Sequence, residues 1–136
     1  MTLNYHDSIL FYDPAFGYLK SERAKAMWEM ICENGDDLLV VFSNIKSKDK
    51  TGEAHWEADY TFTATNKEIH NVIDASFVFK DGKIIEHIDN FDFKIWSKQA
   101  FGFFGKTIGQ TKFFHKRFTK KANKILDKYI SQKNGK

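Results

Sequence analysis

The chain has 136 residues, a formal net charge of +3, 42% hydrophobic residues and 29% charged residues. A chain of this length fits one domain, and the composition excludes a wholly disordered, collagen-like or coiled-coil protein. The single cysteine, Cys32, cannot form an internal disulfide, and the longest apolar run, residues 38–42, is far too short to span a bilayer. We therefore expect a cytoplasmic globular protein with no membrane insertion.

Phenylalanine and basic residues are used unevenly. The chain has 14 Phe, and rigid rings on a curved sheet are typical of a pocket for an apolar ligand, although a filled aromatic core would have the same composition. Residues 1–105 carry 11 Lys and Arg against 17 Asp and Glu, whereas residues 106–136 carry 10 against 1. The basic charge therefore belongs to the C-terminal segment.

The first predicted helix covers residues 21–33. Its apolar residues recur at steps of three and four along the chain: Ala24, Met27, Trp28 and Ile31. Ser21 is a candidate N-cap, and Asn34 with Gly35 is a typical stop signal.

Strands are predicted next. Residues 38–44 are apolar and rich in β-formers, and residues 53–63 alternate an apolar, aromatic face with a polar one. Residues 69–79 and 84–93 continue the pattern, and the turn at 80–83 has the Asp-Gly centre of a hairpin. The last three strands are therefore expected to form an antiparallel meander.

The pattern becomes helical again after Phe93. A short helix is predicted over 95–101, a glycine-punctuated loop follows, and a longer helix is predicted over 110–131. We expect one stripe of the long helix to pack: Phe114, Phe118, Ala122, Ile125 and Tyr129, with Leu126 and Ile130 beside it.

Three segments resemble the nuclear transport factor 2-like (NTF2-like) superfamily, in particular its SnoaL-like polyketide cyclases and ketosteroid-isomerase-like members. They are Tyr-Asp-Pro-Ala-Phe-Gly at 12–17, Ala-Met-Trp at 26–28 and Asp-Gly-Lys-Ile-Ile-Glu-His-Ile-Asp at 81–89. The resemblance covers residues 5–105. It implies an α+β fold, a strongly bent antiparallel sheet wrapped by helices into a cone (a cystatin-like α+β roll), here with an additional C-terminal amphipathic helix. Members isomerise, cyclise, hydrolyse or only bind, so the resemblance indicates chemistry weakly.

One departure from the superfamily affects the domain organisation. Members usually begin with a long helix that forms part of the pocket wall, and only residues 1–4 precede the matching segment here. We therefore expect residues 1–105 to form a SnoaL-like cone without its first helix. We expect residues 106–136 to form a basic helical extension packed on the same domain or on its dimer partner.

Asp13 is the first candidate catalytic residue. It precedes the only proline, which favours extended backbone at the mouth of a turn. The match at Tyr12-Asp13-Pro14 implies the position of the general base in ketosteroid isomerases, and apolar walls would raise its pKa. The alternative is a turn residue whose carboxylate binds nearby backbone N–H groups.

His87 and Asp89 are the other two candidate catalytic residues. Side chains alternate along a strand, so both share a face with Ile85 and Phe91, which marks that face as buried. The position of Asp89 resembles that of the acid/base residue in SnoaL-like cyclases. Alternatively, His87 and Asp89 bond each other and Asn71 inside a polar patch of the core.

As a set, the inward strand positions predict the wall of a ligand pocket, although each residue taken singly is better explained by core packing. These wall residues are Trp56, Tyr60, Asn71, Ile73, Phe77, Ile85 and Phe91. Ala75 stands where ketosteroid isomerases carry a second aspartate, so steroid isomerisation by their oxyanion hole is not expected. No metal site and no cofactor are expected, because the histidines and carboxylates lack a ligand-like spacing.

We therefore expect a small-molecule pocket protein of the SnoaL-like group. It binds a hydrophobic carbonyl compound and, where it is an enzyme, isomerises, cyclises or otherwise transforms this compound by acid/base chemistry. The alternative is a non-catalytic dimeric module that binds a ligand or a protein. Outward positions Val72, Val78 and Ile88 favour a homodimer. The lysines of the C-terminal helix are best explained as a solvated face, so nucleic acid is not an expected partner, although an anionic surface stays an alternative.

Overall fold

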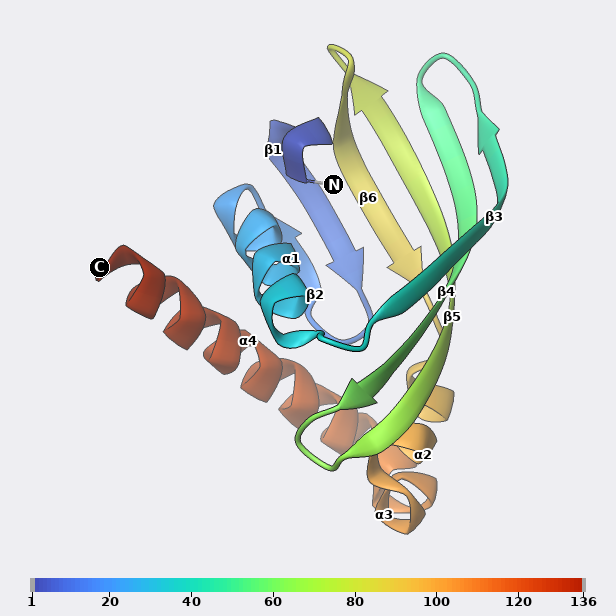
Figure 1. The fold of residues 1–136 in the computed structure, drawn as a ribbon, viewed down its shortest axis with the longest axis vertical. Helices are drawn as coiled ribbons and strands as arrows, with labels where there is room; N and C mark the ends of the chain where they lie inside the picture. Colours follow the sequence, from blue (N-terminus) through green and yellow to red (C-terminus); the bar gives the residue numbers. More distant parts are fainter. Residues whose placement is uncertain (1, 136) are drawn as a thin grey trace.

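The computed structural model describes residues 2–135. The elements follow in chain order: a 3₁₀ turn η1 (Thr2–Asn4), β1 (Tyr5–Asp13), β2 (Gly17–Lys20), α1 (Glu22–Asn34), β3 (Leu39–Ser47), β4 (Thr51–Phe62), β5 (Lys67–Lys80), β6 (Lys83–Asn90), α2 (Phe93–Phe101), α3 (Phe103–Lys106), a 3₁₀ turn η2 (Ile108–Gln110) and α4 (Lys112–Asn134). Figure 1 shows a strongly bent sheet whose long strands β4 and β5 curve from one end of the molecule to the other.

The six strands form one open sheet in the order β2-β1-β6-β5-β4-β3. The predicted meander of β4, β5 and β6 is antiparallel. The predicted bent antiparallel sheet is confirmed except at one pair of strands, because β1 pairs with β6 in parallel. The C-terminal ends of β1 and β6 therefore lie next to each other at the same end of the sheet.

The hairpin between β5 and β6 has the predicted turn. Asp81 and Gly82 both have positive φ, at 55° and 73°, as a two-residue type I′ turn requires. The edge strand β3 begins one residue later than predicted and runs three residues further. Its apolar residues are mostly exposed, and β3 is an edge strand of the described sheet.

Helix α1 matches its prediction to within a residue at each end, and it packs its apolar face on β1, β2 and α4. Ser21 stands at the N-cap position, but its side chain makes no capping hydrogen bond. The core between these elements contains the buried residues Tyr5, Ile9, Phe11, Leu19, Ala24, Ala26, Met27, Met30 and Leu126.

Helix α4 lies along α1 and reaches down to α2 (Figure 1). Phe114 and Phe118 pack against the buried α2 residues Phe93, Trp96 and Ala100. Leu126, Tyr129 and Ile130 pack in the core on α1 described above, which we call the α1 cluster. The predicted stripe is wrong at Ile125, which is 52% exposed while its neighbour Leu126 is fully buried. The buried line rotates around α4 because the helix contacts two separate clusters along its length. Among the described residues, no helix is both long and apolar enough to cross a membrane.

Candidate functional site

The parallel pairing of β1 with β6 brings the three candidate catalytic residues together. Phe11 lies opposite His87 and Tyr12 opposite Ile88, and the next step of this register places Asp13 beside Asp89. Residues two apart on a strand share a face, so His87, Asp89 and Asp13 all point to the concave side. His87 is 1% exposed and Asp89 is 2% exposed.

A hydrogen-bonded chain fixes the ring of His87. Trp28 Nε1 donates to the Tyr5 hydroxyl at 2.8 Å, and this hydroxyl lies 2.6 Å from His87 Nδ1. An indole N–H can only donate, so the arrangement that satisfies every group has the Tyr5 O–H donating to Nδ1. His87 Nε2–H then donates to Asp89 Oδ1 at 2.8 Å. In this arrangement the His87 ring carries a proton on Nε2, which it directs at the Asp89 carboxyl group.

Aromatic rings enclose His87. Trp28 is stacked on it at 6.0 Å between ring centroids, and the ring of Phe77 lies at 4.6 Å. Phe11 and Tyr5 contact it edge-on. Because both ring nitrogens are bonded and the faces are covered, His87 has no atom left that a ligand can reach for proton transfer.

Asp13 closes a turn and carries a perturbed carboxyl group. Its Oδ1 accepts from the N–H groups of Ala15 at 2.9 Å and Phe16 at 2.7 Å, which is the turn geometry that the sequence leaves as an alternative. Burial raises the pKa of Asp13 to about 7 against the opposing effect of the Phe16 N–H, and the charge of Asp89 raises it further. Asp13 is therefore both a turn residue and a carboxyl group that titrates near neutral pH.

The Tyr60 hydroxyl lies close enough to Asp13 for the charge of that carboxyl group to affect it. The hydroxyl accepts from Trp96 Nε1 at 2.8 Å, which leaves its own proton for another acceptor. Burial raises the pKa of Tyr60, and the charge of Asp13 adds to the shift. The hydroxyl therefore stays protonated at neutral pH and keeps a proton that it can donate.

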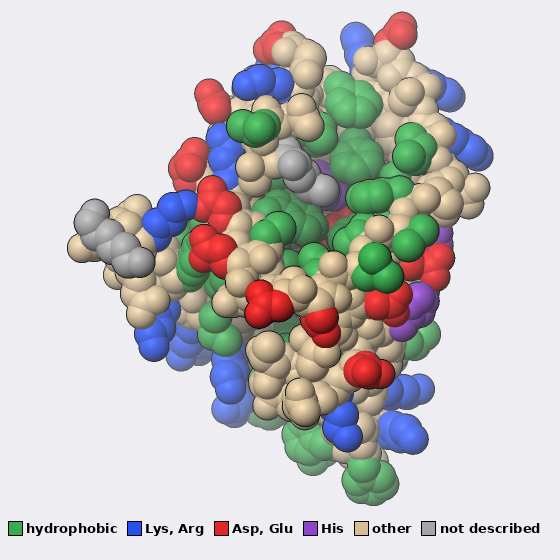
Figure 2. Space-filling model, in the orientation of Figure 1, with side chains coloured by type: hydrophobic (Ala, Val, Ile, Leu, Met, Phe, Trp, Pro, Cys, Tyr) green, Lys and Arg blue, Asp and Glu red, His purple; other side chains and the backbone are tan. Residues whose placement is uncertain are grey.

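An apolar hollow of about 240 Å³ opens on the concave side, over β3, β4, β5 and β6. Figure 2 shows this face hollowed at its centre with hydrophobic side chains around the opening. The hollow is lined by Phe42, Ile45, Lys46, Ser47, Gly52, Glu53, Ala54, Phe77, Phe79 and Ile84. Phe77 belongs both to this wall and to the ring contacts of His87. The hollow therefore borders the polar cluster through one aromatic ring.

The structure divides the predicted wall residues between the buried core and the hollow. Trp56, Asn71 and Ile73 are buried on the concave side, and Tyr60, Phe77 and Phe91 pack against the same core clusters. Of the predicted wall residues, Phe77 lines the hollow, and Ile84 lines it next to the position where Ile85 is expected. The register between β5 and β6 shifts by one residue there, and such a bulge turns the neighbouring side chain to the other face.

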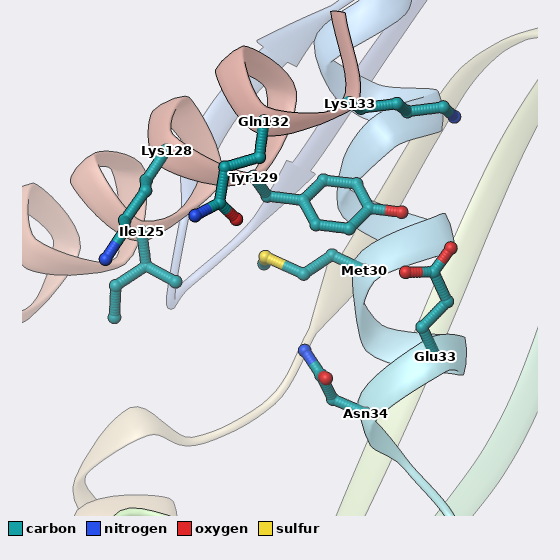
Figure 3. A pocket seen from close by; sticks show the side chains of 8 residues that line it. All are labelled: Met30, Glu33, Asn34, Ile125, Lys128, Tyr129, Gln132 and Lys133. Carbon is teal, nitrogen blue, oxygen red and sulfur yellow. The ribbon is translucent and has the colours of Figure 1, made fainter. Parts of the chain in front are cut away.

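A second groove, of about 490 Å³, lies between α1 and α4 and away from the polar cluster. Figure 3 shows Met30 and the ring of Tyr129 between the two helices, with the Tyr129 hydroxyl directed toward Glu33. Its walls mix charged and apolar side chains and contain none of the candidate catalytic residues.

The outer face of the sheet carries a separate ionic cluster. His55 bonds Asp74 at 2.8 Å and Glu57 at 3.2 Å, and His70 bonds Asp59 at 2.7 Å and Glu57 at 3.0 Å. Within residues 2–135, no group of histidines and carboxylates has the arrangement of a metal site.

Sequence reasoning missed Tyr5, Trp28 and Trp96 as members of the site. Tyr5 bonds the predicted residue His87, and Trp96 bonds the predicted residue Tyr60. Trp28 in turn bonds Tyr5. The helical period places Trp28 on the buried face of α1, but nothing in the sequence indicates which strand residue its N–H meets.

Comparison with known proteins identifies the fold. No family model matches the sequence, and no curated protein does. Among solved structures, a putative SnoaL-like polyketide cyclase from Jannaschia sp. CCS1 has a TM-score of 0.64 at 14% identity, over 74% of this chain and 76% of that one. A hypothetical protein with a ketosteroid isomerase-like fold from Catenulispora acidiphila, solved with trimethylamine, has a TM-score of 0.62 at 8% identity, over 72% and 77%. An LEH-like epoxide hydrolase from M. tuberculosis has a TM-score of 0.58 at 14% identity, over 72% of each chain.

The chain therefore has the NTF2-like fold of the SnoaL-like and ketosteroid-isomerase-like proteins, as the sequence resemblance predicted. These similar structures carry different activities in their descriptions, so the shared fold does not select a reaction.

Proposed function

We propose that this protein binds a small hydrophobic carbonyl compound in its cone and transforms it by acid/base chemistry, as an isomerase or cyclase does. The observation that carries the proposal is the pair of carboxyl groups, Asp13 and Asp89, held side by side at the ends of two parallel strands. Burial and the negative charge of Asp89 both raise the pKa of Asp13, which makes it a stronger base than an ordinary carboxylate.

Asp13 is the proposed general base. Its pKa of about 7 leaves a substantial ionised fraction at neutral pH and gives the carboxylate enough basicity to take a proton from a carbon next to a carbonyl. The Tyr60 hydroxyl is the proposed donor to the carbonyl oxygen, where negative charge develops as the proton leaves. The protonated Asp13 can then return the proton to another carbon of the same ligand.

His87 is a positioning residue in this scheme. Its two nitrogens are engaged by Tyr5 and Asp89, so it orients the Asp89 carboxylate and does not exchange protons with the ligand. Asp89 in turn raises the pKa of Asp13 through its charge. The role predicted for His87 as an acid/base residue is thereby replaced by a role in holding Asp89.

The size of the apolar hollow limits the ligand. Its 240 Å³ lies below the range of roughly 300–1,000 Å³ that holds drug-sized ligands. A compound of one or two fused rings fits this volume. Steroid-sized ligands would need the rings of Phe42 and Phe77 to move apart.

Proton exchange tests the proposed function without knowledge of the natural substrate. The probe is 2-tetralone, a two-ring ketone, in deuterium oxide, with loss of its α-proton signal followed by NMR. The wild-type protein should accelerate the loss, and Asp13→Asn should abolish the acceleration. The exposed Asp7→Asn is the matched control and should leave the rate unchanged. Binding of 2-tetralone without accelerated exchange would refute the catalytic proposal.

The alternative function, a non-catalytic dimeric module that binds a ligand or another protein, has its own supporting observation. The polar groups of the site already satisfy one another, since His87 bonds Tyr5 and Asp89, and Asp13 bonds two backbone N–H groups. In this alternative they are structural. The dimer of this alternative would be the homodimer expected from the sequence, which forms through the outer face of the sheet, where Val72 is exposed. Light scattering should then give a dimer mass that Val72→Asp reduces to that of a monomer.

A further inference from the structure

Exposed apolar side chains gather at one end of the molecule. They belong to α2, α3, η2 and the first turn of α4: Ile95, Phe103, Phe104, Ile108 and Phe113. Phe103 is 82% exposed and Phe113 is 67% exposed. Figure 2 shows hydrophobic side chains projecting from the lower end of the molecule, where Figure 1 places α2 and α3. We call these five residues the apolar tip.

The charge along the segment that carries the apolar tip has one sign. Residues 93–126 contain nine Lys and Arg and no Asp or Glu, and all nine basic side chains are exposed. Residues 1–92, in contrast, carry 9 Lys and Arg against 17 Asp and Glu. The molecule therefore has a cationic end with apolar side chains at its surface and an acidic remainder.

The scaffold under the apolar tip is closely packed. At Gly105, an added Cβ would come within 2.0 Å of the Ser97 carbonyl oxygen, so α3 lies directly against α2. Gln110 Nε2 ties the same segment together, donating to the carbonyls of Lys94 at 3.1 Å and Gly105 at 2.6 Å. Phe103 and Phe104 are thus presented by a fixed support.

We propose that the apolar tip and its lysines dock on an anionic lipid surface. The exposed rings and aliphatic side chains enter the headgroup region, and the surrounding ammonium and guanidinium groups contact the lipid phosphates and carboxylates. This is attachment to the surface, without a membrane-spanning segment. The sequence favours a solvated face for the lysines, and the added observation is the group of five exposed apolar side chains on the same segment.

Two other occupants fit this surface less well. A second copy of the chain would bring two cationic ends together, and their repulsion opposes self-association through the apolar tip. A nucleic acid would match the lysines, but base stacking uses ring faces, whereas Ile95 and Ile108 are aliphatic and Arg117 lies over the Phe113 ring at 5.5 Å from its centroid. A lipid surface uses both the apolar and the cationic groups.

Cosedimentation with lipid vesicles tests the proposal on the full chain. Vesicles of equimolar phosphatidylcholine and phosphatidylserine should bind the protein, and vesicles of phosphatidylcholine alone should not. Binding should weaken as salt is raised, because it depends on exposed charges. Replacing Lys98, Lys106 and Lys112 by Gln should lower the partition constant by about fivefold for each charge removed.

A pair of double variants separates the apolar tip from hydrophobicity in general. Phe103→Ser with Phe113→Ser should lose most of the vesicle binding while the circular dichroism spectrum and thermal midpoint stay close to wild type. Leu39→Ser with Val41→Ser, exposed apolar positions on the edge strand β3, should bind vesicles as the wild type does. Equal loss in both double variants would contradict the proposal.

The remaining outcomes identify another occupant. Tighter binding to a single-stranded oligonucleotide than to the anionic vesicles would overturn the lipid proposal in favour of nucleic acid. A dimer in lipid-free solution that Phe103→Ser dissociates would overturn it in favour of a second copy. Neither result bears on proton exchange at Asp13, so this inference and the proposed function can fail separately.

Discussion

The Tyr5 hydroxyl lies 2.6 Å from His87 Nδ1, and this contact joins the first strand of the chain to the last. The two residues are 82 positions apart, and the parallel pairing of β1 with β6 brings them together. Burial raises the pKa of the Tyr5 hydroxyl far above its ordinary range, so it keeps its proton and its role as donor. The histidine tautomer, and through it the orientation of Asp89, therefore depends on a residue at the very start of the sheet.

Replacing Tyr5 by Phe removes this donor and leaves His87 Nδ1 and the Trp28 N–H without their shared partner. An unsatisfied buried polar group costs about 1–3 kcal/mol, so we expect the free energy of unfolding to fall by that amount. Urea denaturation measures it, and Tyr18→Phe on the exposed side of β2 should change it little. The imidazole nitrogen spectrum of wild-type His87 should show the Nε2–H tautomer, and an Nδ1–H signal would contradict the assigned chain.

The pKa of Asp13 predicts a pH dependence of stability. A carboxyl group with a pKa of about 7 in the folded state and 3.8 in the unfolded state binds more protons when folded, so stability falls as pH rises from about 4 to 7. A tenfold difference in proton affinity between the two states corresponds to about 1.4 kcal/mol, and screening by water at this partly buried group reduces the total to about 2 kcal/mol. Asp13→Asn keeps an oxygen acceptor for Ala15 and Phe16 but cannot titrate. The wild-type minus Asn difference in unfolding free energy should therefore decline across this range, and a constant difference would show an ordinary pKa.

The outer ionic cluster should also lose stability as pH rises, but in a higher pH range that begins near 6.5. Hydrogen bonding to Asp74 raises the pKa of His55 above its ordinary 6.5, and hydrogen bonding to Asp59 raises that of His70. The protonated rings face Glu57, Asp59 and Asp74, so their stabilising effect is complete below pH 6.5 and is lost as pH rises through the raised pKa.

Proton NMR titration of the two imidazole rings checks this expectation. Asp74→Asn should lower the midpoint of His55 and leave that of His70 nearly unchanged, since His70 bonds Asp59 and Glu57. Equal shifts of both midpoints would show that the cluster responds to overall charge and not to the individual contacts.

Helices, strands and turns can be predicted from the sequence where a local pattern of residues indicates them. Alternation in β4 and β5, the Asp81-Gly82 turn and the helical period of α1 are local signals, and each matches the structure. Ile84 lines the hollow, whereas alternation along β6 predicts Ile85. The cause is a bulge, which is a mismatch in register between β5 and β6. No single strand carries that information, so alternation alone places the wrong residue.

The candidate site shows the same limit. Asp13, His87 and Asp89 are recognisable from their residue types and their resemblance to a family motif. Their common location depends on the parallel register of β1 with β6, and the bonds that fix them come from Tyr5 and Trp28 on other elements. Such long-range partners are set by packing and leave no spacing pattern in the sequence.

Gly105 provides a test of the close packing under the apolar tip. An added Cβ would lie 2.0 Å from the backbone oxygen of Ser97, which cannot move without shifting α2. Gly105→Ala should therefore cost about 1–3 kcal/mol, the usual range for overpacking. The nearby Ser97→Ala removes a buried hydroxyl that has no hydrogen-bond partner in the described chain, so it should be neutral or slightly stabilising. Differential scanning calorimetry of both variants measures the contrast, and a neutral Gly105→Ala would mean that α3 is not held against α2.

Two neighbouring residues of α4 test whether this helix is part of the fold. Leu126 is fully buried in the α1 cluster, whereas Ile125 is 52% exposed beside it. Truncating a buried large aliphatic side chain to Ala costs about 2–5 kcal/mol, while an exposed change costs less than about 0.5 kcal/mol. The same helix is held by ion pairs from Asp127 to Arg23 and from Lys133 to Glu29.

We therefore expect Leu126→Ala to lower the free energy of unfolding by several kcal/mol in urea denaturation and Ile125→Ala to leave it nearly unchanged. The same chemical truncation at adjacent positions keeps helix propensity and charge nearly equal, so the difference reports packing. Removing residues 112–136 should then reduce stability at least as much as Leu126→Ala and increase the fluorescence of a hydrophobic dye, because the α1 face becomes exposed. Equal and small effects of the two point variants would mean that α4 is a detachable tail, in which case the truncated chain would also keep its thermal midpoint.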